Sequence, residues 1–284
     1  MRANPRELKR RVGAARKVLQ ETAALQRIAA ERLLRSRSLA DAQREYSERL
    51  SGACAALQGI GRIARHPLFG LPADQPVCLV ACGADRGLCG AYNATITAEI
   101  LRSVHAQQPR PPILLVVGQA IQDQLRRLDI APDHVVPQPP LRSHDEALRE
   151  LAAVAFTFVT EKRCAAVDVL YAHDTRSLHL EVRVERLFPW VPAPVPCDLA
   201  RCTFEPDVDE LLPRLAREFL RAALERAFLH GLAAEQAARH LTMSRAVENT
   251  KQMIAELLLR YHRARQDAIT IEMAEFAAGG VRAC

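Results

Sequence analysis

The sequence predicts an α/β fold in which both ends of the chain form one long antiparallel coiled coil around a central, open and mostly parallel sheet domain. Three observations predict it. Each end of the chain has a long stretch without glycine or proline, apolar residues recur there in steps of four and three, and the middle alternates short apolar runs with helical segments. We expect three segments: an N-terminal helix in 1–65, the sheet domain in 75–195 and a C-terminal helix in 206–284.

The N-terminal segment predicts one long helix. Asn4 is a favourable cap, Pro5 suits the first helical position, and neither glycine nor proline occurs between Gly13 and Gly52. A heptad seam follows from the spacing of mostly apolar and small residues. Its positions are Leu8, Val12, Ala15, Leu19, Thr22, Gln26, Ala29, Leu33, Ser36 and Ala40.

The C-terminal segment repeats this pattern. Residues 232–278 contain no glycine or proline and would span roughly 70 Å as a helix, far more than an ordinary globular element. A repeat of 3.5 residues indicates a left-handed supercoil with a partner helix, which we expect to be the N-terminal helix running antiparallel. Its positions are Met243, Val247, Thr250, Ile254, Leu257, Tyr261, Ala264, Ala268 and Ile271.

The middle of the chain reads as alternating strands and helices between proline-rich breaks, which is typical of an open, Rossmann-like α/β domain. Buried strands are expected at Val77–Cys82, Ile113–Val117 and Ala166–Tyr171, with an edge strand at Leu178–Val184. Helices are expected at about Tyr92–His105, Gly118–Leu128 and Ser143–Lys162.

Composition indicates a globular protein with a basic N-terminal end. The 284 residues are 49% hydrophobic, and no signal peptide or bilayer-length apolar run is present, so we expect a cytoplasmic location. The net charge of +6 is concentrated in residues 1–65, which carry fifteen Lys and Arg against six Asp and Glu. This asymmetry indicates either an acidic partner or, more simply, a solvated helix face.

The eight cysteines are scattered over a chain too large to need disulfides, which favours reduced thiols. Cys197 and Cys202 form the closest pair outside the expected strands. No second Cys or His pair stands at zinc spacing, so no metal site is expected.

The segment Gly83–Gly90 follows an apolar strand and resembles a phosphate loop, but it matches neither standard template. A P-loop requires a lysine and a hydroxyl residue after its last glycine, and none follows here. The dinucleotide motif requires three spaced glycines, of which only Gly87 and Gly90 fit. We expect these glycines to serve a strand-to-helix turn, and we expect no cofactor.

Catalytic groups are sparse. His173 and Asp174 follow an expected strand, where an α/β active site would lie, but no nucleophile or metal cluster accompanies them. A surface turn is the simpler interpretation. Glu272 and Glu275 fit an exposed helix face.

Together these stretches resemble the gamma subunit of F-type ATP synthase, its central rotor stalk. The resemblance extends through the whole chain, from Thr22–Leu25 and Ile28–Ala30 at the start to the run Tyr261–Glu272 near the end. A second C-terminal match is Ala234–Arg239, followed by Met243. The family signature in the sheet domain is matched by Asp85, Arg86, Gly87, Leu88, Cys89, Gly90 and Asn93.

The resemblance implies a non-catalytic rotor that turns inside a hexamer of alpha and beta subunits and couples ion translocation to ATP synthesis or hydrolysis. It further implies contacts with the epsilon subunit and the membrane c-ring, without nucleic acid or bilayer insertion. The implied location is peripheral, on the cytoplasmic face of the bacterial plasma membrane. Residues implied to contact partners are Arg265, Gln266, Thr270, Met243, Arg239 and Leu25.

Two other functions are consistent with parts of the sequence. The sheet domain alone would suit a protein that binds a small ligand and dimerises through its helices. The basic helices would suit a coiled-coil adaptor for nucleic acid, although only 5% of residues are aromatic, whereas a single-strand binder needs stacking side chains.

Overall fold

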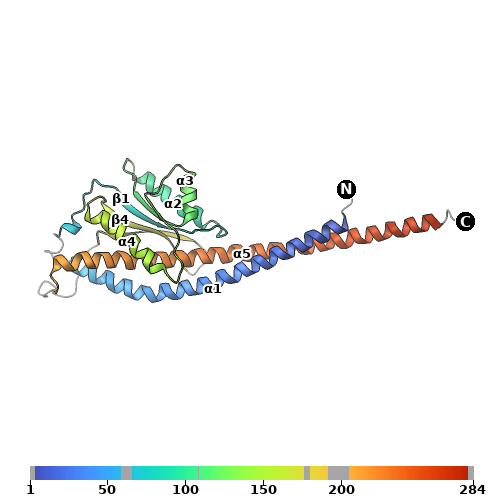
Figure 1. Cartoon of the computed structure of the whole chain (residues 1–284), viewed down its shortest axis with the longest axis horizontal. Helices are drawn as coiled ribbons and strands as arrows, with labels where there is room; N and C mark the ends of the chain where they lie inside the picture. The colour runs from blue at the N-terminus through green and yellow to red at the C-terminus, as the bar shows by residue number, and fades with distance from the viewer. Residues whose placement is uncertain (1–3, 59–65, 108, 176–179, 191–204, 281–284) are drawn as a thin grey trace. The chain divides into compact units, whose positions relative to one another are not determined.

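The computed structural model describes residues 4–58, 66–107, 109–175, 180–190 and 205–280. The chain divides into two compact units, one formed by residues 1–29 with 240–284 and the other by residues 30–239. This division runs through the two long helices, α1 (Pro5–Gln58) and α5 (Val208–Gly280), which contribute to both units. Both helices confirm the expectation of uninterrupted terminal helices (Figure 1).

Helix α1 begins at the predicted cap. The side-chain Oδ1 of Asn4 accepts a hydrogen bond from the backbone N–H of Arg6 at 2.9 Å, and its backbone oxygen accepts from Glu7 and Leu8. These bonds satisfy N–H groups that have no partner within the helix. Pro5 lacks an N–H and therefore loses nothing as the first helical residue.

The first unit pairs the start of α1 with the second half of α5, and the two run antiparallel (Figure 1). Its seam is the predicted one: Leu8, Val12 and Ala15 are at most 8% exposed, whereas Val18, between seam positions, is 50% exposed. Nδ1 of His240 on α5 lies 3.3 Å from the backbone oxygen of Gln26 on α1. On α5 the seam begins with Met243 and Val247, both buried, and continues through the partly buried Thr250, Ile254, Leu257 and Tyr261.

The second unit is built on a five-stranded sheet of order β3-β2-β1-β4-β5. The first four strands are parallel, and β5 pairs antiparallel with β4 at the edge. The strands are β1 (Val77–Cys82), β2 (Ile113–Val117), β3 (His134–Val136), β4 (Ala166–His173) and β5 (Glu181–Phe188). The helices between them are α2 (Tyr92–Ala106), α3 (Gln119–Arg126) and α4 (His144–Thr160), and a short 3-10 helix, η1 (Pro67–Phe69), precedes β1.

These elements confirm the predicted open sheet, with two local differences. β1 and β2 have the expected bounds, and β5 is the expected edge strand but begins at Glu181. The short β3 was not expected. Helix α5 begins at Val208, within the expected segment 206–284, and continues through Pro213 and Gly231.

Alternate side chains of β1 point into the two halves of the core. Cys78, Val80 and Cys82 pack with α4, the second half of α1 and the first half of α5. Leu79 and Ala81 face the other way and pack with α2 and α3. Since both faces of the sheet are covered at its centre, strands β1 and β2 are apolar runs without polar alternation.

Candidate functional site at the signature loop

The connection between β1 and α2, residues 83–91, lies at the carboxyl edge of the parallel strands and carries most of the family signature, Asp85–Asn93; we call it the signature loop. Asp85 joins three of the connections at that edge. Its Oδ1 accepts hydrogen bonds from the backbone N–H of Gln119, just after β2, and from that of Gln138, just after β3, each at 2.9 Å. Open α/β sheets usually bind ligands at this edge, which here is closed by bonds within the chain.

Asn93, the last signature residue, is only 5% exposed, and its side chain bonds to residues of the signature loop. Its Oδ1 accepts from the backbone N–H of Ala84 at 3.3 Å, and its Nδ2 donates to the backbone oxygen of Arg86 at 3.4 Å. The same nitrogen lies 3.7 Å from Sγ of Cys89, a buried thiol whose pKa is raised by desolvation. Asn93 therefore stabilises the conformation of this loop.

The loop is attached to helix α5 through a buried carboxylate, Glu235, which is 2% exposed. Its Oε2 accepts from Nε2 of Gln138 at 2.5 Å, and its Oε1 forms an ion pair with Nη1 of Arg239. The other guanidinium nitrogen of Arg239 donates to the backbone oxygens of Gly87 at 3.3 Å and Arg86 at 3.5 Å. Every partner of this carboxylate is polar or charged, which a buried charge requires.

Asp85, Asn93, Gln138, Glu235 and Arg239 thus form one polar network, which we call the clamp. It links the loops after β1 and β3 to a single stretch of α5. Next to it, the hydroxyl of Tyr92, a fully buried residue at the start of α2, donates to the backbone oxygen of Gly231 on α5 at 3.0 Å. The arrangement is suited to holding a helix, because charge-assisted bonds are stronger than neutral ones.

Backbone amides at the start of the connection after β1 and at the turn after β2 are used inside the chain. The N–H of Gly83 donates to Val117, that of Ala84 to Asn93, and that of Gly118 to Val136. The glycines permit close packing: a Cβ on Gly83 would lie 2.1 Å from Cδ1 of Ile121. These contacts support the structural interpretation of the loop over a nucleotide site.

A second polar cluster joins the second half of α1, α4 and the first half of α5. Arg221 pairs with Asp145 at 2.9 Å and with Glu225 at 3.0 Å. Glu225 also accepts from Nε2 of Gln43 at 2.8 Å and lies 3.0 Å from Nε2 of His144. The hydrogen bond to Glu225 raises the pKa of His144. Three helices are therefore tied together beneath the sheet.

The residues predicted to contact partners lie in different environments. Arg265, Gln266 and Thr270 are exposed on α5, and the hydroxyl of Thr270 donates to the backbone oxygen of Gln266. Leu25 on α1 is 41% exposed. Met243, by contrast, is 4% exposed in the helix seam, so little of its side chain is left for a partner. Arg239, in the clamp, makes its contacts within the chain.

The expectation of a simple surface turn at His173 and Asp174 is wrong. The carboxylate of Asp174 is 6% exposed and receives two hydrogen bonds from Arg37 of α1, at 2.6 and 2.8 Å. Glu272 and Glu275 are exposed on α5.

The predictions about metal binding and cysteines involve some residues that lie outside the described part of the chain. In the part of the chain that the structure describes, no group of three or more His, Cys, Asp or Glu is placed to hold a metal. The described cysteines are free and buried, and Cys197 and Cys202 lie outside the described residues.

The sequence alone did not point to Gln138 or Glu235 as site residues. Glu235 falls within a stretch that resembles the family, but nothing local shows that its carboxylate is buried. Gln138 stands in a proline-rich break after a strand of only three residues. Because that strand was itself not predicted, no local signal in the sequence pointed to Gln138.

Two solved structures share this fold. One chain, from the central stalk and c-ring of the Tetrahymena thermophila mitochondrial ATP synthase, aligns with a TM-score of 0.61 at 20% identity, covering 79% of this chain and 98% of its own. Another, from the Euglena gracilis mitochondrial ATP synthase, has a TM-score of 0.54 at 12% identity, covering 92% of this chain and 95% of its own. The long helices and the sheet domain attached to them therefore form a fold that is also found in chains of ATP synthases.

The sequence comparisons identify the family to which the chain belongs. A family model described as ATP synthase matches residues 4–283. The ATP synthase gamma chain of Moorella thermoacetica is 30% identical over 282 residues, and that of Macrococcus caseolyticus is 28% identical over 285 residues, with 98% of each chain covered in both cases. The chain belongs to the ATP synthase gamma-chain family and is a central rotor subunit, which confirms the resemblance seen in the sequence. Among the described residues, no helix is both long enough and apolar enough to cross a bilayer.

Proposed function

We propose that this chain transmits torque in an F-type ATP synthase, turning inside a hexamer of alpha and beta subunits and coupling ion flow to ATP synthesis or hydrolysis. The observation that carries the proposal is the clamp, which fastens the sheet domain to α5 through the buried pair of Glu235 and Arg239. A rotor must not let its parts slip under load. Breaking a buried ion pair leaves an uncompensated charge, so such a joint resists opening.

In this proposal torque enters through the sheet domain, which contacts the epsilon subunit and the membrane c-ring. Three connections carry it into the helices: the clamp, the cluster around Arg221, and the ion pair between Arg37 and Asp174. These connections tie α5 or α1 to other elements of the same unit. A load divided over several polar joints places less force on each of them.

The first unit supplies the surface that meets the hexamer. Exposed polar residues Arg265, Gln266 and Thr270 share α5 with large exposed apolar side chains, of which Met273 is 69% and Phe276 88% exposed. We assign the polar set to contacts with loops of the hexamer and the apolar end to a bearing, where a buried charge would be costly. The basic residues of α1 face acidic loops of the beta subunits.

The chain takes no part in the chemical step. The nucleotide sites lie on neighbouring subunits, and rotation changes them by presenting different contacts to each in turn, which shifts their conformational populations. The subunit is peripheral and lies on the cytoplasmic face of the bacterial plasma membrane. The bonded amides of Gly83 and Ala84, at the start of the connection after β1, support this assignment.

The proposal is tested by purifying the tagged chain from its host under mild conditions and identifying its partners. We expect alpha, beta and epsilon subunits in stoichiometric amounts, with ATP hydrolysis in the eluate. A bead attached to the sheet domain of the immobilised complex should rotate when ATP is supplied. A chain that purifies alone, or with nucleic acid, would contradict the proposal.

A double substitution tests the hexamer contacts. Arg265→Ala with Gln266→Ala is expected to lower ATP turnover of the assembled complex by about tenfold, the effect of losing about 1.4 kcal/mol of contact in the turning state. Both side chains are exposed on α5, so folding should be unchanged. The matched control is Gln252→Ala with Arg260→Ala, also exposed on α5. Equal turnover in the two double variants would reject the assignment.

A further inference from the structure

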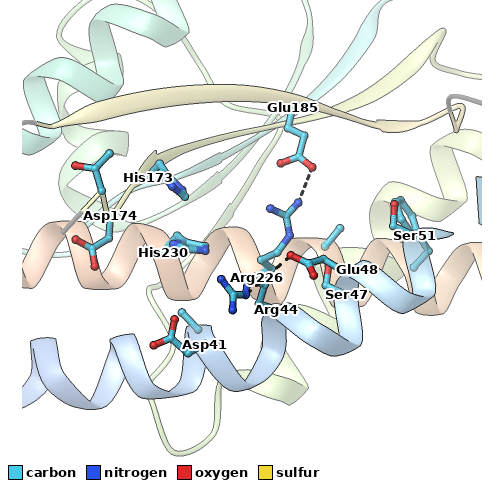
Figure 2. A pocket seen from close by; sticks show the side chains of 14 residues that line it. Asp41, Arg44, Ser47, Glu48, Ser51, His173, Asp174, Glu185, Arg226 and His230 are labelled. Carbon is cyan, nitrogen blue, oxygen red and sulfur yellow. Dashed lines mark hydrogen bonds and ion pairs between the residues drawn. The ribbon is translucent and has the colours of Figure 1, made fainter. Parts of the chain in front are cut away.

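A polar cavity of about 930 Å³ lies in the second unit between α1, the end of β4, β5 and α5. Two neighbouring histidines line it, His173 at the end of β4 and His230 on α5 (Figure 2). Their rings face each other with centroids 4.6 Å apart and planes tilted by 36°. This ring contact joins the sheet to the long helix at a point distinct from the clamp.

Neither ring has a full set of hydrogen bonds. Nδ1 of His173 and Nδ1 of His230 are both buried, and no partner for either is found among the described residues. A neutral imidazole tolerates this at modest cost, because one of its ring nitrogens carries no proton. An imidazolium has two N–H donors and a full charge, so the same burial becomes much more costly.

The acidic groups around the pair already have cationic partners. On α1 and the loop after β4, Asp174 is paired with Arg37, and on β5 and α5, Glu185 is paired with Arg226. On β5, Glu181 is paired with Arg183 near the histidine pair. On α1, Glu48, which is paired with Arg44, and Asp41 line the cavity. The ring of Tyr171 lies beside both histidine rings. A proton arriving on either histidine therefore meets Arg226 and Arg183 as well as the carboxylates.

We propose that the ring pair of His173 and His230 is an acid-sensitive latch, which holds the end of β4 against α5 while both rings are neutral and releases it when they become protonated. The proposal concerns the second unit alone and stands whether or not the chain turns in an ATP synthase. In the assembled protein the same release would loosen one attachment of the sheet domain to α5 when the surrounding solution becomes acidic.

The sign of the effect follows from the direction of the titration. Desolvation is the main cause that lowers the pKa of both rings. For His230, repulsion from His173 and Arg226 adds to desolvation, and together they lower its pKa to about 4. An unfolded histidine titrates near 6.5, so between about pH 6.5 and pH 4 the open state binds more protons than the closed one. The latch contact therefore loses stability as the pH falls through this range.

Hydrogen exchange of the full chain tests the latch. Protection factors, which correct for the intrinsic pH dependence of exchange, are compared at pH 7.0 and 4.5 for β4 and for α5 around His230. We expect protection there to fall roughly tenfold on acidification, less than the full linkage effect because both rings are partly exposed. In the double variant His173→Phe with His230→Phe the change with pH should largely disappear, because two stacked aromatic rings remain without a titrating group.

A matched control variant and a second measurement, an NMR titration, accompany this test. His262→Gln, at an exposed position of α5, should respond to pH as the parent chain does. If the Phe variant fails to fold, titration of the parent's histidine ring signals by NMR still tests the proposal, since both rings should titrate below an exposed histidine. Unchanged protection at pH 4.5 in the parent chain, or ring signals that titrate near 6.5, would overturn the latch.

Discussion

Replacing Glu235 with alanine is expected to destabilise the sheet domain by about 3–5 kcal/mol, the usual cost of removing one partner from a buried ion pair. Glu235 is 2% exposed, and its loss would leave the guanidinium of Arg239 without its carboxylate partner and would remove the shorter hydrogen bond of the Gln138 amide. Trp190, the single tryptophan, packs against Phe69 and Phe188 in this unit. Its fluorescence during urea unfolding therefore reports the stability of the sheet domain.

The matched control for this substitution is Glu248→Ala, at an exposed position of the same helix, which should change stability by less than about 0.5 kcal/mol. A double variant, Glu235→Ala with Arg239→Ala, should recover part of the loss, because no unpaired charge would remain buried. If Glu235→Ala and Glu248→Ala unfold at the same urea concentration, the clamp does not stabilise the sheet domain.

The second large effect is expected for Gly118→Ala, which should lower the free energy of unfolding by about 2–6 kcal/mol. Gly118 caps α3 with φ of 116°, a conformation that side chains other than glycine adopt only under strain of about 1–3 kcal/mol. An added Cβ would also lie 2.8 Å from the backbone oxygen of Ala84. That oxygen belongs to the buried start of the signature loop, so relieving the overlap would cost about 1–3 kcal/mol more.

Gly87→Ala provides the comparison within the same region, since nothing lies within 4 Å of the position of its added Cβ and its φ is not in the left-handed range. We expect a change within about 0.5 kcal/mol. Unfolding followed by Trp190 fluorescence measures both variants. A Gly118→Ala chain as stable as Gly87→Ala would show that the connection between β2 and α3 can move away from the signature loop.

The features that the sequence predicted well are those with a local physical cause. The seam of α1 from Leu8 to Ala40 follows from a 3.5-residue repeat, and its start follows from the cap at Asn4. Strands β1 and β2 have the predicted bounds because each is a continuous apolar run between breaks. In each case neighbouring residues carry the whole signal.

Two differences show where local patterns fail. Strand β3 has only three partly buried residues, so it exists because β2 offers an edge to pair with. Helix α5 passes through Pro213 and Gly231, which locally disfavour a helix. It continues because residues on either side of them, among them Leu212 and Leu232, are buried against the sheet core, and that burial outweighs propensity.

The sequence by itself determined the long helices, the alternation of strands and helices, and the family to which the chain belongs, because periodicity and short motifs are properties of neighbouring residues. Only the tertiary structure decided which polar side chains act together. Glu235 meets Gln138, Arg37 meets Asp174, and His173 meets His230 across large separations along the chain. These pairs form because packing both faces of the sheet brings distant segments together and removes their polar groups from water, which then require partners within the protein.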